Sequence, residues 1–138
     1  MANLMKTVTD IEAFKVLQQA LRATGLDETL AELGPFTLFA PTDQAFARLP
    51  DGMLETVFKD LPQLRAVLAR HIAPGVITVV DALGKIAPKT LGGQTLSFES
   101  VNGLTVNNAR ITTADLIADN GVLHIVDDVL AENFEVNE

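Results

Sequence analysis

The segment Phe36–Phe46, FTLFAPTDQAF, decides the fold because a strand ends and a helix begins within it. Phe36 to Ala40 is an apolar run of strand length, and Pro41 ends it because proline lacks the N–H that a central ladder needs. Thr42 and Asp43 are typical of a helix start, where a hydroxyl or carboxylate accepts from free backbone N–H groups. The segment therefore predicts a strand that leads directly into a short helix.

A second segment near the other end of the chain, Asn120–Leu130 (NGVLHIVDDVL), has the complementary pattern. It opens with Asn-Gly, the strongest short signal for a hairpin turn, and continues as an apolar strand. We expect Ile111 to Ile117 and Val122 to Val129 to pair around this turn.

Together the two segments resemble the paired signature blocks of the fasciclin-like (FAS1) domain, in the same order along the chain. The resemblance extends from about Thr7 to Leu130. It implies an α+β protein, a seven-stranded antiparallel β-sandwich or wedge flanked by several short α-helices. It also implies a module that acts in cell adhesion or surface interaction and is not an enzyme. Because one such domain stands alone here and lacks cysteine, we expect a single-domain bacterial member.

The length of 138 residues fits one domain over residues 1–138, which would bury roughly two thirds of its unfolded surface without disulfides. The chain has no cysteine, so cysteine supplies neither a nucleophile nor a metal ligand. We expect the acidic tail at about 131–138 to be flexible.

The charge balance bears on the class of partner. Eighteen acidic residues against ten basic ones give a net charge of −8, and no Lys or Arg follows Ile111. Nucleic acids and anionic membranes are bound through clustered basic residues, so both are disfavoured as partners.

The start of the chain, Met1–Lys6, lacks the features of a signal peptide, and no apolar run reaches the length of a membrane span. Relatives in the resembled family are usually exported. The protein is then either cytoplasmic or exported with its signal removed, and the resemblance favours an extracellular, cell-surface or periplasmic protein.

The first half of the chain has helical periodicity. Thr9–Glu12 is a candidate capping box for a helix from about Asp10 to Ala23, which Gly25 would end. Its predicted core face consists of Ile11, Phe14, Leu17 and Leu21. Further short helices are predicted after Asp27 with Leu30 and Leu33 buried, at Asp43 to Leu49, at Gly52 to Phe58, and from Pro62 to about Arg70.

From Ile72 onward the period shortens and turn signals multiply, so this half is predicted to be mostly β. Helices followed by antiparallel strands indicate the α+β class. The predicted inward residues around the middle hairpin are Leu96, Phe98, Val101, Leu104 and Val106.

The resemblance also implies candidate residues for partner binding. In animal members a Tyr-His pair ahead of a Pro-Gly turn is associated with integrin binding, and Arg70-His71 ahead of Pro74-Gly75 occupies that place here. A second associated segment corresponds to Asp115-Leu116, just before the Asn-Gly hairpin. The implied partner is a cell-surface or matrix protein, with a glycan as another possibility, and the protein is expected to be a monomer.

Each candidate also has a structural interpretation. Asp115 could be a solvated residue that protects a strand edge from aggregation. His71 could bind the carbonyls at a helix end or pack in the core. His124, flanked by apolar residues, is expected to be a hydrogen-bonded structural histidine.

The sequence offers little for catalysis. Ser97 and Ser100 are the only serines, neither in a Gly-x-Ser-x-Gly elbow, and nothing favours a constellation of Ser97, His124 and Asp127. We expect no cofactor and no obligatory metal, since two distant histidines without cysteine do not make a zinc site. The alternative is a small-ligand-binding or hydrolytic domain with a groove between the helices and the sheet.

Overall fold

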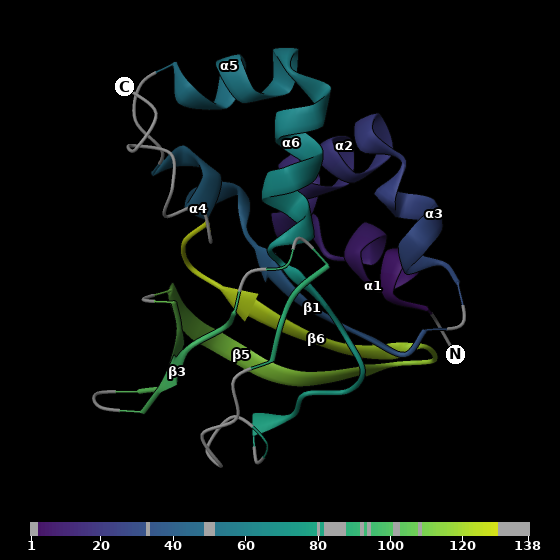
Figure 1. The fold of residues 1–138 in the computed structure, drawn as a ribbon, viewed down its shortest axis with the longest axis vertical. Helices are drawn as coiled ribbons and strands as arrows, with labels where there is room; N and C mark the ends of the chain where they lie inside the picture. The colour runs from purple at the N-terminus through teal and green to yellow at the C-terminus, as the bar shows by residue number, and fades with distance from the viewer. Residues whose placement is uncertain are drawn as a thin grey trace.

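The computed structural model describes residues 3–32, 34–48, 52–79, 81, 88–91, 93, 95–100, 103–107 and 109–129. In this part of the chain, helices cover one face of a mixed sheet with the strand order β2-β1-β6-β5-β4-β3 (Figure 1). The protein therefore has the α+β architecture that the sequence predicts.

The helices and strands alternate little along the chain. The helical elements are α1 (Leu4–Asp10), the 3-10 turn η1 (Glu12–Phe14), α2 (Lys15–Thr24), α3 (Leu26–Leu30), α4 (Asp43–Ala47), α5 (Met53–Lys59) and α6 (Leu61–Ala69). The strands are β1 (Phe36–Pro41), β2 (Ile72–Pro74), β3 (Phe98–Glu99), β4 (Thr105–Val106), β5 (Ala109–Ala118) and β6 (Gly121–Val126).

The N-terminal helix prediction was wrong in its details. A separate helix, α1, precedes the predicted one, and Asn3 caps it by accepting from the Lys6 N–H at 2.8 Å. The hydroxyl of Thr9 donates back to the Met5 carbonyl within α1, so it does not form the predicted capping box. Instead, Asp43 at the start of α4 accepts from the Val16 N–H in the first turn of α2, at 2.8 Å. This cap comes from a residue distant in sequence, so local spacing could not predict it.

The predicted strand-to-helix junction is confirmed. Strand β1 ends at Pro41, and the Thr42 hydroxyl accepts from the Ala45 N–H at 3.2 Å to cap α4. The ends of two other helices also agree with the sequence. Gly25 ends α2, and Pro62 lies in the first turn of α6, as predicted. Asp60, which the sequence analysis did not single out, caps α6 by accepting from the Gln63 N–H.

The centre of the sheet differs from the expected antiparallel arrangement. Strands β1 and β6 pair in parallel, with Leu38 opposite Leu123 and Phe39 opposite His124, whereas the other strand pairs are antiparallel. Most of the described chain lies between β1 and β6, which allows them to run in the same direction. Hairpin signals predict only pairs that follow one another in sequence, such as β5 and β6, and so the fully antiparallel sheet was a wrong prediction.

The described residues contain six strands, together with an isolated bridge between Lys89 and Thr95. The predicted seventh strand is not among them. The predictions made for Leu33, Leu49, Val101 and the tail at 131–138 lie outside the described residues.

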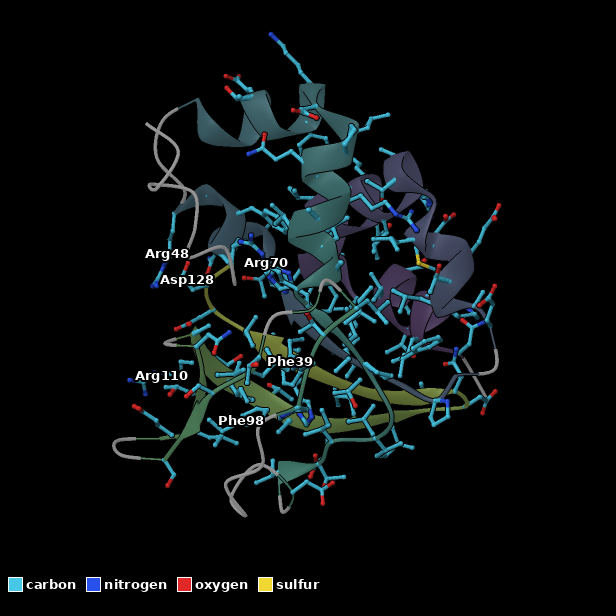
Figure 2. The ribbon with its side chains drawn as sticks, viewed as in Figure 1. Phe39, Arg48, Arg70, Phe98, Arg110 and Asp128 are labelled. Carbon is cyan, nitrogen blue, oxygen red and sulfur yellow. The ribbon has the colours of Figure 1, made fainter. Side chains whose placement is uncertain are left out.

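Strand β1 is buried on both faces, which explains why its sequence is apolar except at Thr37. Leu38 and Ala40 face the helices, in a core cluster built mainly from α1, α2, α3 and α6. Phe39 faces the other way, in a smaller cluster with Ile77, Leu96, Ala73, Val106, Ala109 and Val126. On that face the ring centroids of Phe39 and Phe98 are 5.9 Å apart (Figure 2). The candidate residue Asp115 is linked to this face through His124, whose ring stacks on Phe39.

Candidate functional site

Strand β5 contains a bulge at Asp115. The pairing of β5 with β6 shifts register between Thr113 and Leu116, and Asp115 has a φ of 59°. That left-handed backbone conformation is uncommon for residues other than glycine, although aspartate adopts it more readily than most. The Asp115 side chain keeps 40% of its surface exposed. The bulge thus presents a carboxylate to solvent and points the backbone N–H of the same residue at the neighbouring strand.

The residue that receives this N–H is His124 on β6, which is buried. Its Nδ1 accepts from the Asp115 N–H at 3.1 Å, and its Nε2 lies 2.6 Å from the Ile77 carbonyl oxygen. Because a carbonyl only accepts, the proton is on Nε2 and the ring is neutral. Burial lowers the pKa of His124, while the bond to Ile77 and the negative charge of Asp115 act in the opposite direction. The ring also stacks on Phe39, with centroids 5.2 Å apart. The expectation of a hydrogen-bonded structural histidine agrees with this geometry.

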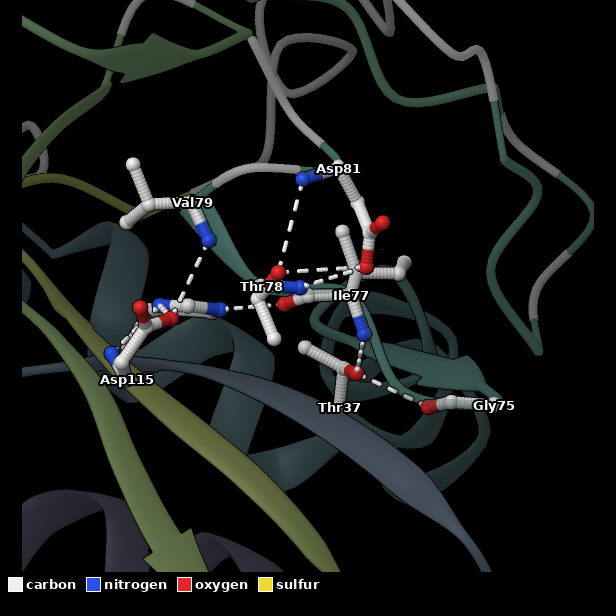
Figure 3. A network of polar contacts seen from close by, with 8 residues as sticks. Thr37, Gly75, Ile77, Thr78, Val79, Asp81 and Asp115 are labelled. Atoms are coloured by element: carbon white, nitrogen blue, oxygen red, sulfur yellow. Dashed lines mark hydrogen bonds and ion pairs between the residues drawn. The ribbon is translucent and has the colours of Figure 1, made fainter. Parts of the chain in front are cut away.

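The chain at Gly75–Val79, here called the 75–79 segment, is held on the sheet by the same set of polar contacts (Figure 3). The Thr37 hydroxyl donates to the Gly75 carbonyl and accepts from the Ile77 N–H, both at 2.8 Å. The Val79 N–H donates to Oδ1 of Asp115 at 3.1 Å. The segment is therefore attached to β1, β5 and β6 by one side chain from each strand.

The other candidate pair, Arg70-His71, lies where α6 meets the sheet (Figure 2). His71 has no exposed surface, and its Nδ1 donates to the Val67 carbonyl at 2.9 Å, as the helix-end interpretation predicted. Arg70 is half-buried at the C-cap of α6. Of this pair, Arg70 is therefore partly exposed, whereas His71 is enclosed in the protein.

Strand β2 joins the two candidate regions, since it runs from His71 to the 75–79 segment. Phe39 contacts both regions: its N–H donates to the His71 carbonyl at 2.8 Å, and its ring stacks on His124. Phe39 and Thr37 are residues that sequence reasoning treated only as strand positions. The polar Thr37 inside an apolar run was the available signal, because a buried hydroxyl normally has hydrogen-bond partners.

Two apolar side chains are exposed on the elements that meet at Asp115, namely β5 and the 75–79 segment. Ile117 on β5 is 63% exposed, and Val76 in the 75–79 segment is 48% exposed. Leu116, one of the sequence candidates, instead packs partly buried against the helix-side core. The exposed apolar surface at this end of β5 thus comes from Ile117, whereas Leu116 packs against the helix-side core.

The geometry does not assemble the hydrolytic constellation of Ser97, His124 and Asp127. Both ring nitrogens of His124 are engaged by backbone groups of Asp115 and Ile77. The Asp127 carboxylate accepts from the Arg110 N–H at 2.9 Å.

The described residues also bear on metals and membranes. Among them, no three His, Asp or Glu side chains come together as a possible metal site. No helix in this part of the chain has both the length and the apolar character of a membrane span.

The burial of His71 predicts a loss of stability in acid. Burial lowers its pKa from 6.5 to about 4, with the charge of Arg70 in the same direction and the Val67 bond opposing both. The unfolded chain therefore takes up a proton before the folded one does as pH falls through 6.5. The free energy of unfolding is highest above that pH, and His71 lowers it by about 2 kcal/mol between about pH 7.5 and pH 5.

Urea unfolding at a series of pH values measures this loss. His124, whose pKa is also lowered, adds to it in the same direction. The variant His71→Gln should therefore retain only a shallower dependence. A free energy of unfolding that stays constant between about pH 7.5 and pH 5 would contradict the linkage.

Comparisons with known proteins agree with the family resemblance and with the α+β fold. The protein-family model described as Fasciclin domain matches residues 12–132. The chain is 35% identical to the uncharacterized protein sll1735 of Synechocystis sp., over 94% of this chain and 98% of that protein. It is 40% identical to protein sll1483 of the same organism, over 93% of this chain and 72% of that protein.

Animal proteins match over a smaller share of their own length. The chain is 33% identical to the transforming growth factor-beta-induced protein ig-h3 of Sus scrofa over 94% of this chain, but it spans only 19% of that protein. Among solved structures, the fold is similar to a FAS1 domain pair from the insect cell adhesion molecule fasciclin I. The TM-score is 0.78 at 17% identity, and the match covers 98% of this chain and 52% of that one.

Proposed function

Since the chain belongs to the fasciclin (FAS1) domain family, we propose that it is a cell-adhesion or cell-surface interaction module that binds a protein or glycan partner without catalysis. The family match and the fold shared with an insect cell adhesion molecule support this proposal. The main supporting observation is the β5 bulge, where a partly exposed carboxylate is held by a hydrogen bond from the Val79 N–H. Such a side chain loses little conformational freedom when a partner binds.

The proposed contact surface is centred on Asp115. The carboxylate would provide the polar contact, and the exposed side chain of Ile117 would provide apolar area beside it. Leu116 holds the strand against the core and so fixes the position of the bulge. Arg70, partly exposed at the C-cap of α6, is the second candidate contact. The net charge of −8 favours a partner surface that carries basic groups.

The proposed setting is the cell exterior, as an extracellular, surface or periplasmic protein, and the proposed state is a monomer. The alternative of a small-ligand or hydrolytic domain gains no support from the contacts of His124, because its ring nitrogens are both bound by backbone groups.

Attachment of cells to the immobilised protein tests this proposal. We expect cells of the organism that produces the protein to attach more strongly than to a surface coated with an inert protein. The variant Asp115→Asn retains an oxygen for the Val79 N–H but removes the charge, and should weaken attachment about tenfold. Ile117→Asp and Arg70→Gln test the remaining contacts in the same assay.

The matched control is Asp119→Asn, which removes an exposed charge from the same hairpin. It should leave attachment unchanged. Attachment no better than to the inert surface would refute the adhesion function itself. Strong attachment that none of the contact variants weakens would leave adhesion standing and show that the contact residues are wrongly assigned.

A further inference from the structure

The strongest unexplained feature of the molecule is that one buried imidazole, His124, joins two irregular parts of the chain. Its two ring nitrogens bind the β5 bulge at Asp115 and the 75–79 segment at Ile77. We propose that His124 is a proton-operated latch: the neutral ring leaves the Asp115 carboxylate on the Val79 N–H, and uptake of a proton at Nδ1 draws that carboxylate to the ring and releases the Val79 end of the 75–79 segment.

The closed state depends on the neutral ring. The Asp115 N–H needs an acceptor, and Nδ1 can accept only while it carries no proton. The same residue uses its carboxylate, at Oδ1, to accept from the Val79 N–H. Asp115 therefore connects His124 and the 75–79 segment through two separate hydrogen bonds, one from its backbone and one to its side chain.

A single proton changes both of these bonds. When Nδ1 is protonated it becomes a donor, so the Asp115 N–H loses its acceptor. The nearest anionic acceptor for the new N–H is Oδ1 of Asp115, which lies 3.9 Å from Nδ1. Movement of the carboxylate toward the ring takes it away from the Val79 N–H. Proton uptake thus exchanges a backbone–ring bond for an ion pair and frees the end of the 75–79 segment.

The ring itself is expected to stay in place during this exchange. Nε2 donates to the Ile77 carbonyl in either protonation state. The stacking contact with Phe39 also remains favourable, because an aromatic face attracts a cation. The bulge is the part that moves, since the φ of 59° at Asp115 carries a local conformational cost that the bond to Nδ1 offsets.

The ionisable groups around His124 influence the pH at which the latch opens. Asp115 on β5 is the ionisable residue in contact with the ring. Strand β1 and the remainder of β6 have no ionisable side chain, and Arg110 lies at the other end of β5, where its N–H binds Asp127. Asp81 accepts from Thr78, and Glu99 on β3 is exposed.

With burial as the dominant influence, the pKa of His124 lies below 6.5. The latch is therefore closed at neutral pH and opens on acidification. Asp115 is also the centre of the proposed contact surface, so opening would change partner binding. That consequence rests on the proposed function, whereas the latch itself does not.

Residue-resolved NMR of the whole chain tests the latch without any partner. The His124 ring signals and the amide signals of Asp115 and Val79 should shift together as pH is lowered, with one shared midpoint below 6.5. Hydrogen-exchange protection of the Val79 and Asp115 amides should fall by about tenfold or more across the same range. The amide of Ile72, in β2, provides the internal reference.

Two variants separate the latch from general acid unfolding. His124→Gln removes the titrating ring and should abolish the shared transition. Asp115→Asn keeps an oxygen for the Val79 N–H but cannot form the ion pair, so it should move the midpoint to lower pH, and it serves alone if His124→Gln does not fold. The proposal is overturned if the Asp115 and Val79 amides do not follow the His124 ring, or if Asp115→Asn leaves the midpoint unchanged.

Discussion

Replacing Asn120 by alanine is expected to lower the free energy of unfolding by about 4 kcal/mol. The side chain is buried, and its Oδ1 accepts from the Leu4 N–H at the start of α1, at 2.8 Å. Its Nδ2 donates to the Leu30 carbonyl at 2.7 Å and to the Glu32 carbonyl at 2.6 Å, at the end of α3. Alanine would leave these backbone groups without their partner in a place that water reaches poorly.

Chemical denaturation followed by circular dichroism measures this loss. Asn120→Asp keeps an oxygen for the Leu4 N–H but places its second oxygen against two carbonyls, so at neutral pH it should destabilise the fold at least as much. Asp119→Ala alters the exposed neighbour in the same turn and should change stability by less than about 0.5 kcal/mol. A loss below about 1 kcal/mol for Asn120→Ala would show that the turn can satisfy those groups in another way.

Replacing Gly121 by alanine is expected to cost about 4 kcal/mol or more, which approaches the whole stability of a small domain. A Cβ at this position would meet the carbonyl oxygen of Phe36, with the Phe36 carbonyl carbon at 2.8 Å and its nitrogen at 3.0 Å. These are backbone atoms of β1, opposite Gly121 in the parallel pair, so no flexible side chain can move aside. The first pair of the central β1–β6 ladder would have to open.

The matched control is Gly25→Ala. Gly25 has a φ of 81°, and a Cβ there would have no atom within 4 Å. It therefore incurs only the conformational cost of a left-handed residue, about 1 kcal/mol. Thermal unfolding of both variants separates the clash from the conformational cost. Equal losses in the two proteins would mean that β1 and β6 separate readily at this end.

The sequence predicted the local elements well where the signal lay within a few residues. Thr42 caps its helix, Gly25 ends another, and Asn120-Gly121 turns β5 into β6. Helix α1 was missed because its buried face consists of only Leu4 and Val8, too few residues to establish a period. The parallel pairing of β1 with β6 was missed because no local signal encodes contacts between distant strands.

The candidate site was predicted only in part for the same reason. Asp115 is exposed on its strand, which fits both interpretations given for it. Its bulge and its bond to His124 across the ladder depend on pairing between strands, which no local pattern encodes. His71 and Arg70 are adjacent in sequence, yet a helix end turns one into the core and leaves the other half-buried.

The sequence by itself determined the family, the α+β class and the positions of most turns, because caps, glycines and apolar periods act over a few residues. Only the tertiary structure decided the direction of the central strands, the role of Asn120 as a tie between α1, α3 and the sheet, and the environment of His124. Each of these depends on groups far apart in the chain that meet only once the core excludes water, and there an unpaired polar group becomes costly.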